Sequence, residues 1–291
     1  MWVVLFNPSS GGGKGRRIAT QVKDYLASQN LEIREVSGPD YESARINFKR
    51  VLDQHSERIK AVVVVGGDGM VHLAIQELAN SAVPMALIPA GTGNDFARAL
   101  KLDLKNPISN LKHYLDTSPV AVDLGKVKGR FFADILSTGF DSIVNERANR
   151  MRLLKGRMKY NIAIILVLST FRPKSYRFRV DAIDFTTEAM LIAVSNGQSY
   201  GGGMKVTPGA RIDDGLFDVM ILGPVSKFEF LRVFPKVFSG SHTSHPAVKI
   251  MRGSSVTIES EAIAYADGER MGELPVTAEI APSALLTWRN L

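Results

Sequence analysis

Hydrophobic residues recur in the first 120 positions as short runs, separated by longer segments whose apolar positions have helical spacing. The runs cover residues 2–7, 31–36, 60–65 and 85–89. After the third run, the apolar residues at positions 71, 74, 75 and 78 follow the i, i+3, i+4, i+7 pattern of one helical face. Strands that alternate with helices predict a parallel, doubly wound sheet with helices on both faces.

The pattern changes at about residue 120 to short strands separated by turns. Predicted strands cover residues 120–127, 131–137, 176–185, 189–195, 216–222, 256–259, 263–266 and 276–280. Alternating apolar residues at positions 176, 178 and 180 are typical of a half-buried antiparallel strand. Residues 142–168 and 227–238 are expected to be helical, so the second part of the chain is predicted to be mostly β.

Composition narrows the class of protein without changing this picture. The chain has 291 residues, 45% of them hydrophobic and 22% charged, which is typical of a globular protein. Cysteine is absent, which excludes disulfides, thiolate catalysis and cysteine-ligated metal centres and makes the cytoplasm the default location. The apolar run at 162–171 would span only about 15 Å as a helix, against a bilayer core of about 30 Å. The first six residues are too short an apolar stretch for a signal peptide.

Glycine-rich turns follow three of the predicted parallel strands, at residues 7–13, 66–69 and 90–95. In doubly wound sheets, ligands bind at the carboxyl ends of the strands. Glycines at 66, 67 and 69 let the backbone approach a phosphate, and Asp68 among them favours a neighbouring cation, most plausibly Mg²⁺. The competing interpretation is a tight turn with a helix-capping Asp.

A second polar loop, at residues 89–98, again follows a predicted buried strand. Thr92 and Asn94 can bind phosphate oxygens, while Asp95 adds a carboxylate; a helix N-cap at Asn94 or Asp95 is the simpler alternative. Two such loops at one sheet edge favour a nucleotide site. No Gly-x-x-x-x-Gly-Lys-Ser/Thr, Gly-x-Gly-x-x-Gly or protein-kinase motif is present.

Five ordered motifs give the sequence a specific resemblance. They are Asn-Pro-Ser-Ser-Gly at 7–11, Gly-Gly-Asp-Gly at 66–69, residues 89–98, Asp-Asp-Gly at 213–215 and Asp-Gly-Glu at 267–269. In order and spacing the chain resembles the diacylglycerol kinase catalytic-domain family. The resemblance implies an α/β + β fold: an NAD kinase/diacylglycerol kinase-like nucleotide-binding domain at 1–120, to which 281–291 returns, and a lipid-substrate β-sandwich domain at 121–280. It further implies an active site in the interdomain cleft and transfer of the γ-phosphoryl group of ATP, with Mg²⁺, to a lipid hydroxyl, with a diacylglycerol-like acceptor.

The same resemblance implies roles for individual residues. Nucleotide-binding roles fall on Asn7, Pro8, Ser9, Ser10, Gly11, Ser37, Gly66, Gly67, Asp68, Gly69, Gly91, Thr92 and Asn94. The implied catalytic residues are Glu269 as the base, Asp267 as its support and Asp68. Metal-binding roles fall on Asp68, Asp95 and Asp123 for a catalytic Mg²⁺, and on Arg211, Asp214 and Leu216 for a structural Mg²⁺. Residues 211–216 are equally typical of a turn between strands.

The sequence departs from the family pattern directly after Asp68. Relatives have a Thr followed closely by Asn and Glu, whereas this chain has Met70, His72 and Leu73. A lost hydroxyl contact to phosphate costs on the order of 1 kcal/mol, so a catalytically weakened nucleotide- or lipid-binding homologue stays an alternative to the lipid kinase. His72 is expected on a solvated helix face. NAD kinase, which shares the Gly-Gly-Asp-Gly loop, is the other alternative.

Positive charge is concentrated in residues 145–180. This segment has ten basic residues and one acid, so it carries +9, whereas the whole chain carries +7. A basic cluster around the apolar run at 162–171 predicts a peripheral contact with an anionic membrane, at the inner membrane face for a cytoplasmic protein. A solvated helix face is the alternative. The aromatic residues here form no nucleic-acid stacking motif, so no nucleic-acid partner is expected; a homodimer is compatible with the sequence.

Overall fold

A computed structural model of the chain describes residues 1–8, 10–151 and 157–290. The backbone divides into two compact units. Unit 1 consists of Met1–Leu124, Gly201–Gly203 and Ala281–Leu291, and unit 2 of Gly125–Tyr200 and Met204–Ile280. The chain passes between the units within two strands, β5 (Val120–Val127) and β16 (Val276–Thr287), and at the short Gly201–Gly203 segment.

Unit 1 contains a parallel sheet in the strand order β2-β1-β3-β4. Its strands are β1 (Trp2–Phe6), β2 (Ile33–Val36), β3 (Ala61–Gly66) and β4 (Met85–Pro89). The end of β16 pairs with β4 in parallel, through Thr287 and Met85. Every residue of β1, β3 and β4 is buried, which requires that both faces of the sheet are covered.

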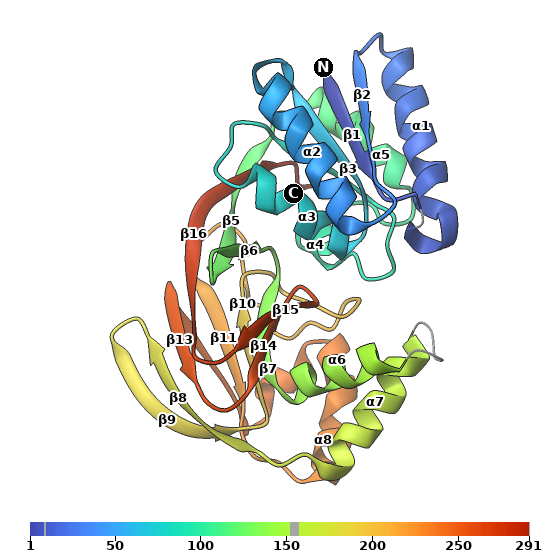
Figure 1. Cartoon of the computed structure of the whole chain (residues 1–291). Coiled ribbons are helices and arrows are strands. Elements are labelled where there is room, and N and C mark those ends of the chain that lie inside the picture. The colour runs from blue at the N-terminus through green and yellow to red at the C-terminus, as the bar shows by residue number, and fades with distance from the viewer. Residues whose placement is uncertain (9, 152–156, 291) are drawn as a thin grey trace. The chain divides into compact units, whose positions relative to one another are not determined.

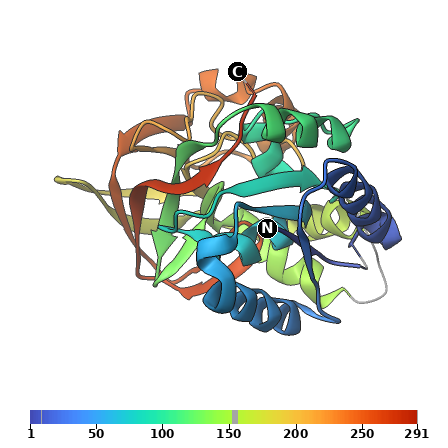
Figure 2. The same cartoon turned by 90° about the horizontal axis from the view of Figure 1, so that it is seen from above.

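Helices cover both faces of this sheet. They are η1 (Ser10–Gly13), α1 (Lys14–Ser28), α2 (Tyr41–His55), η2 (Ser56–Arg58), α3 (Asp68–Leu78), α4 (Asp95–Ala99) and α5 (Pro107–Asp116). Helix α1 contacts α5, and α2 contacts α3, so that the two pairs lie on opposite sides of the strands (Figures 1 and 2). The doubly wound α/β architecture predicted for the N-terminal part is confirmed.

Unit 2 contains two antiparallel sheets. One has six strands in the order β12-β11-β10-β7-β14-β15; the other has the order β16-β13-β8-β9. The strands not yet defined are β6 (Arg130–Phe132), β7 (Ile135–Gly139), β8 (Lys174–Val180), β9 (Ile183–Ala189), β10 (Leu191–Ser195), β11 (Phe217–Leu222), β12 (Val248–Gly253), β13 (Ser255–Glu259), β14 (Ile263–Ala266) and β15 (Glu269–Glu273).

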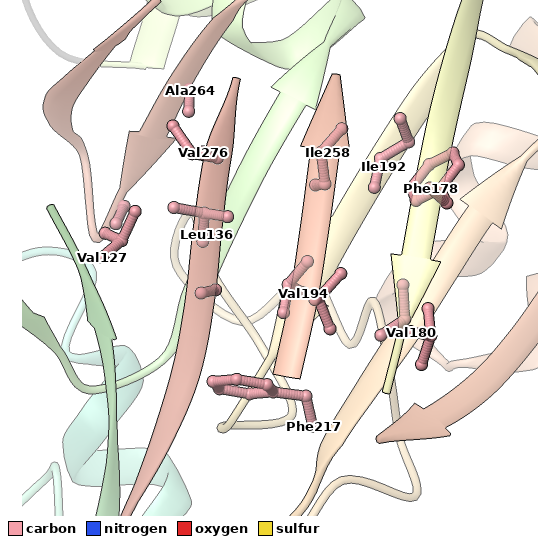
Figure 3. Packing of buried hydrophobic residues seen from close by; sticks show 14 of the residues in the cluster. Val127, Leu136, Phe178, Val180, Ile192, Val194, Phe217, Ile258, Ala264 and Val276 are labelled. Carbon is pink, nitrogen blue, oxygen red and sulfur yellow. The ribbon is translucent and has the colours of Figure 1, made fainter. Parts of the chain in front are cut away.

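The core of unit 2 lies between these two sheets (Figure 3). Leu136 and Ile192 of the six-stranded sheet and Phe178 and Ile258 of the other sheet all belong to one buried cluster. Two sheets that enclose a shared apolar layer form a β-sandwich. The predicted β-sandwich is therefore confirmed.

Helices pack on the outer face of the six-stranded sheet. They are α6 (Phe140–Arg150), α7 (Arg157–Thr170), α8 (Lys227–Val233), η3 (Phe234–Phe238) and η4 (Ser241–Ser244). The ring of Phe140 lies 4.8 Å from that of Phe230 and 5.5 Å from that of Phe171, which joins α6, α7 and α8 into one cluster. The helix predicted at 142–168 is two helices instead. Within the described residues, no helix is long and apolar enough to cross a membrane.

Two predicted strands also have different bounds. Residues 131–137 contribute to both β6 and β7, and the segment 176–185 is a hairpin rather than one strand. Asp181 forms its turn with a positive φ of 49°. Its side-chain Oδ1 accepts hydrogen bonds from the N–H groups of Ser254 at 3.0 Å and Ser255 at 2.9 Å. A polar side chain thus fixes the chain reversal between β8 and β9, which the alternation of apolar residues did not predict.

Candidate active site

The two polar loops of unit 1 leave neighbouring strands side by side. Gly66 at the end of β3 pairs with Pro89 at the end of β4. A Cβ atom on Gly67 would lie 2.8 Å from the Cα of Gly91, and one on Gly91 would lie 2.4 Å from the Cα of Gly67. The loops therefore pack backbone against backbone, which requires glycine at both positions.

Asp68 links the two loops and begins α3. Its Oδ2 accepts the N–H of Asn94 at 3.0 Å, and its Oδ1 accepts the N–H of Asp95 at 2.8 Å. Burial, and second the charge of Asp95, raise the pKa of the Asp68 carboxyl. The Nε of the half-exposed Arg98 lies 4.0 Å from the Oδ1 of Asp95, at the edge of ion-pair distance.

A divalent cation fits this carboxylate pair. The negative charge of the partly buried Asp68 and the buried Asp95 is what a cation would neutralise, and oxygen ligands suit Mg²⁺. Among the described residues, no three His, Asp or Glu side chains gather as a complete metal site. Proteins commonly hold Mg²⁺ through one or two carboxylates together with substrate phosphates and water.

Asn94 stabilises its own loop. Its Oδ1 accepts the N–H of Gly91, and its Nδ2 donates to the carbonyl of Gly91, both at 2.9 Å. Asn94 has a left-handed φ of 56°, which Asn tolerates better than most residues. The neighbouring Thr92 has an exposed side chain at the crest of the loop. Of the two polar side chains predicted to contact phosphate, Thr92 is the more accessible.

Asp95 is held by a segment that the sequence interpretation missed. Its carboxylate is 4% exposed and accepts the N–H groups of Gly202 and Gly203, both at 2.8 Å. Both glycines have positive φ values, 85° and 102°. The run of three glycines at 201–203 was the available signal, because consecutive glycines between two strands indicate a special backbone conformation.

A pocket of about 210 Å³ lies beside the first loop. It is lined by Asn7, Gly38, Asp40, Tyr41, Ala44, Gly67, Gly69 and Met70. Three predicted nucleotide-binding residues, Asn7, Gly67 and Gly69, thus share one cavity. Ser37 lies next to the lining residue Gly38, and its carbonyl accepts a hydrogen bond from Asn47 at 3.0 Å.

Pro8 lies in the turn after β1, and Ser10 and Gly11 belong to η1. The predicted Ser9 contact lies outside the described residues. This first glycine-rich turn therefore comes directly after a strand of the parallel sheet, as the other two loops do.

The three residues that depart from the family pattern are buried. Met70 is 7% exposed, lines the pocket and packs against Gly66, whereas His72 and Leu73 are fully buried. The expectation of a solvated His72 is wrong, because α3 packs against β3, β4, α2 and α4 and is buried on most of its circumference. Leu73 is a core residue, so its position adds no polar group to the pocket.

Asp123 lies on β5 and is 4% exposed. Its Oδ1 accepts the N–H of Ser283 on β16 at 2.7 Å. This contact holds the returning C-terminal strand within unit 1. A part for Asp123 in a catalytic metal network stays a prediction.

In unit 2, Asp267 and Gly268 form the turn between β14 and β15, and Glu269 follows as the first residue of β15. Asp267 and Gly268 have φ values of 49° and 86°, as a two-residue hairpin turn requires. The Asp267 carboxylate accepts three backbone N–H groups, from Ala133 at 2.6 Å, Asp134 at 3.0 Å and Ile135 at 3.1 Å. Asp267 therefore fixes the turn that carries Glu269, which is half-buried at the start of β15.

The residues that bind Asp267 continue into a buried polar segment of unit 2. Asn196 is fully buried and donates its Nδ2 to the carbonyl of Ala133 at 2.8 Å. The N–H groups of Asn196 and Gly197 both donate to the carbonyl of Asp134. The sequence interpretation missed Asn196; a polar Asn-Gly pair directly after an apolar strand was the signal.

At the implied structural Mg²⁺ site of Arg211, Asp214 and Leu216, which stays a prediction, the carboxylate of Asp214 already has partners within the protein. The Oδ1 of Asp214 accepts the N–H of Leu216 at 3.2 Å, and its Oδ2 is bound by the guanidinium of Arg252. The same guanidinium lies 3.6 Å from Asp218, its cross-strand partner. Arg252 thus supplies the positive charge that a metal ion would bring to these carboxylates.

The basic segment 145–180 is divided between helices and a strand. Arg147 and Arg150 are exposed on α6. On β8, Arg179 forms an ion pair with Asp184 at 3.0 Å and Arg177 one with Glu259 at 3.9 Å. Arg152 and Lys155 lie outside the described residues. Among the described side chains of the segment, some basic residues are thus paired with acids and others are exposed.

Comparisons with known proteins agree with this architecture. Residues 1–127 match the family model described as the diacylglycerol kinase catalytic domain, and residues 134–288 match the YegS C-terminal NAD kinase beta sandwich-like domain. The diacylglycerol kinase of Mycobacterium tuberculosis strain H37Rv is 36% identical over 98% of this chain and 94% of its own length. That of Bacillus subtilis is 28% identical over 94% and 90%.

Solved structures show the same fold at lower identity. A putative diacylglycerol kinase from Bacillus anthracis has a TM-score of 0.79 at 20% identity, covering 99% of this chain and 95% of that one. An NAD kinase from Archaeoglobus fulgidus in complex with ATP has a TM-score of 0.57 at 14% identity, covering 100% and 94%.

Proposed function

Because the chain belongs to the diacylglycerol kinase family, it is a lipid kinase, and we propose that it transfers the γ-phosphoryl group of ATP, with Mg²⁺, to the hydroxyl group of a diacylglycerol-like lipid. The pair formed by the partly buried Asp68 and the buried Asp95 is the observation that supports ATP and Mg²⁺ most strongly. These carboxylates lie at the end of two parallel strands, beside glycines that leave room for phosphate. A structural turn alone does not require two neighbouring carboxylates, and burial together with the charge of Asp95 raises the pKa of Asp68.

The roles of the chain's own residues follow from their contacts. The glycine-rich loops would receive the phosphates of ATP beside the pocket that Asn7, Gly67 and Gly69 line. Asp68 and Asp95 would hold Mg²⁺. When bound, the metal neutralises the charge that develops on the phosphoryl oxygens.

Glu269 is the proposed general base. Phosphoryl transfer needs a group that accepts the proton of the attacking hydroxyl, and a carboxylate within hydrogen-bond reach can do so. The three amide donors on Asp267 hold the adjacent turn in one conformation, which supports a fixed position for Glu269. Asp267 is thus a positioning residue in this proposal.

An acceptor dissolved in a membrane requires the kinase to work at the bilayer surface. We propose a peripheral contact with anionic lipid at the inner membrane face, where ATP is available in the cytoplasm. The described residues 145–151 and 162–180 contribute exposed cations, among them Arg147, Arg150 and Arg172.

The direct test offers the purified protein labelled ATP and Mg²⁺ with a panel of lipids in mixed micelles, and NAD in a parallel reaction. We expect a phosphorylated diacylglycerol and no phosphorylated NAD. The variant Glu269→Gln should bind ATP normally but transfer no phosphoryl group. Normal ATP binding without any phosphorylated lipid would refute the proposed reaction.

A catalytically weakened homologue is the second candidate, and Met70 and Leu73 favour it. Both side chains are buried and apolar where relatives carry polar groups. The variant Met70→Thr restores a hydroxyl beside the pocket. A gain in turnover of roughly tenfold or more would support a weakened enzyme, since a hydrogen bond to a charged group contributes 1.5–3 kcal/mol, as a rough range; unchanged turnover would show that the site tolerates Met.

A further inference from the structure

Helix α8 and the 3₁₀ helix after it expose large apolar side chains. Phe228 is 79% exposed, Phe238 54% and Leu231 52%. Phe228 and Leu231 are three residues apart and therefore lie on the same side of α8. We call Phe228, Leu231 and Phe238 the α8 ridge.

The exposure of the ridge does not come from a loosely held helix. Phe230, between the two exposed residues of α8, is 5% exposed, with its ring 4.8 Å from that of Phe140 and 5.6 Å from that of Phe234. The Ser226 hydroxyl caps the helix by accepting the N–H of Glu229 at 3.1 Å. One face of α8 is thus anchored in the core, and the opposite face presents apolar groups outward.

Cations accompany the ridge. Lys227, Arg232 and Lys236 are exposed in the same twelve-residue stretch of α8 and η3, and Lys227 donates a hydrogen bond to the carbonyl of Ser169 on α7. Its one acid, Glu229, lies 3.1 Å from the Nε2 of His245. Apolar side chains flanked by Lys and Arg are typical of helices that lie in a membrane interface.

Helix α7 extends the apolar surface of the same helical cluster. Ile165 is 65% exposed and Leu166 38% exposed, whereas Val167 and Leu168 are buried with Phe230. Grouped exposure of large apolar residues marks interaction surfaces, whereas single exposed residues are ordinary. The exposed Lys and Arg residues beside these apolar side chains favour contact with an anionic membrane surface.

We propose that the α8 ridge inserts into the headgroup region of an anionic lipid bilayer, with Lys227, Arg232 and Lys236 contacting lipid phosphates. This inference rests on the proposed lipid-kinase function, because a kinase with a membrane-resident acceptor must meet that surface. It assigns the insertion to α8 and η3, outside the basic segment 145–180.

Sedimentation of the full chain with vesicles tests this assignment. Wild-type protein should bind vesicles of phosphatidylglycerol and phosphatidylcholine, bind pure phosphatidylcholine weakly, and lose binding as salt rises. Phe228→Ser and Leu231→Ser should each weaken binding by roughly tenfold, because each removes a large apolar group from the inserted surface. Ile183→Ser is the matched control: Ile183 is 58% exposed on β9, and its loss should leave binding unchanged.

A second variant tests the same point without removing apolar surface. Phe228→Trp should be quenched by brominated lipids in the anionic vesicles, whereas the native Trp2 and Trp288, 6% and 5% exposed, give a constant background. No quenching, or equal vesicle binding by Phe228→Ser and wild type, would overturn the assignment. A Phe228→Ser variant that binds vesicles normally but changes from dimer to monomer would also overturn it, in favour of a second copy as the occupant.

Activity separates this inference from the function on which it depends. A soluble short-chain diacylglycerol below its micellar concentration should be phosphorylated equally by wild type and Phe228→Ser, while activity on vesicles falls in the variant. If neither the wild type nor Phe228→Ser phosphorylates either lipid, the kinase proposal fails. The vesicle-binding result still decides whether the α8 ridge inserts.

Discussion

Asp68 in unit 1 and Asp267 in unit 2 are both fixed by backbone amides, but their charges are compensated differently. Asp267 accepts three N–H groups, whereas Asp68 accepts two and lies beside a second buried carboxylate, Asp95. The first arrangement is complete within the protein. In the proposed reaction a bound cation would complete the second, so that Asp68 would take part in the chemistry and Asp267 in positioning.

The largest expected effect follows from Asp68→Asn. This variant removes the charge but keeps an oxygen that can accept an amide hydrogen bond, so turnover should fall roughly a thousandfold while the fold is kept. The amide replaces one of the two oxygens that accept the N–H groups of Asn94 and Asp95, and this loss opposes the relief of repulsion from Asp95, so the melting temperature should change by only a few degrees. Steady-state kinetics and thermal unfolding measure the two results; near-normal turnover would remove Asp68 from the metal site.

Asp267→Ala should instead lower both stability and turnover. It removes three hydrogen bonds to a carboxylate, which predicts a loss on the order of 3 kcal/mol in the free energy of unfolding, and it releases the turn that carries Glu269. Denaturant unfolding and kinetics measure both effects.

Asp181→Ala is the matched control for Asp267→Ala. Asp181 also forms a turn with a φ of 49° and accepts the N–H groups of Ser254 and Ser255. It should lower stability similarly and leave turnover intact. A stable Asp267→Ala protein with full activity would contradict the positioning role.

The sequence predicted the regular parts of both units better than the contacts that fix the site. Strands 85–89 and 263–266 have the predicted bounds because continuous apolar runs between turn residues are unambiguous. Strands β12 and β15 were missed because they are the edges of the six-stranded sheet, where charged residues such as Lys249 and Arg270 interrupt the apolar alternation.

The contacts of the site escaped prediction because they join distant positions. Asp95 with Gly202, and Asp267 with Ala133, are each separated by more than a hundred residues, and no local pattern encodes such a pairing. Arg252 could not be assigned to Asp214 for the same reason. The motifs indicated which residues matter, whereas the fold determines which hydrogen-bond and charge partners each of them has.

Asp141 adds a third way of compensating a buried carboxylate, by protonation. Burial raises the pKa of Asp141 from 3.8 to about 6, which hydrogen bonds from Ser137 and the Ser142 N–H only partly offset. A raised pKa means that the folded state prefers the neutral acid, so this group lowers stability as pH rises from about 4 to 6, with no further change above. Relative to Asp141→Asn, wild type should therefore lose about 3 kcal/mol over that interval.

Denaturant unfolding of both proteins at pH 4.5 and pH 7.5 should record about 2 kcal/mol of this difference, because about a third of it is already lost at pH 4.5. Asp103→Asn is a suitable control, because Asp103 is exposed and hydrogen bonds from the N–H groups of Asn106 and Lys105 lower its pKa. The pH dependence of Asp103 has the opposite sign to that of Asp141. Because the pKa of Asp103 is lowered in the folded state, its contribution to the free energy of unfolding is lost as the pH falls. Parallel pH curves for wild type and Asp141→Asn would show that Asp141 ionises normally.

The fourth way of compensating a carboxylate is a cationic side chain of the protein itself, and Arg252 provides one. Its variants are expected to have the smallest effect on stability. In the Asp68→Asn background, where the catalytic pair cannot bind metal, neither EDTA nor Mg²⁺ should change the melting temperature, because the guanidinium already neutralises Asp214 and Asp218. Arg252→Ala should lower stability by about 1 kcal/mol, given that this side chain is half-exposed, and millimolar Mg²⁺ should restore part of the loss.

Arg179→Ala, which breaks the exposed pair with Asp184, should show no such rescue. A clear fall in the melting temperature on adding EDTA to the Arg252-containing protein would mean that a metal ion, not Arg252, completes this cluster.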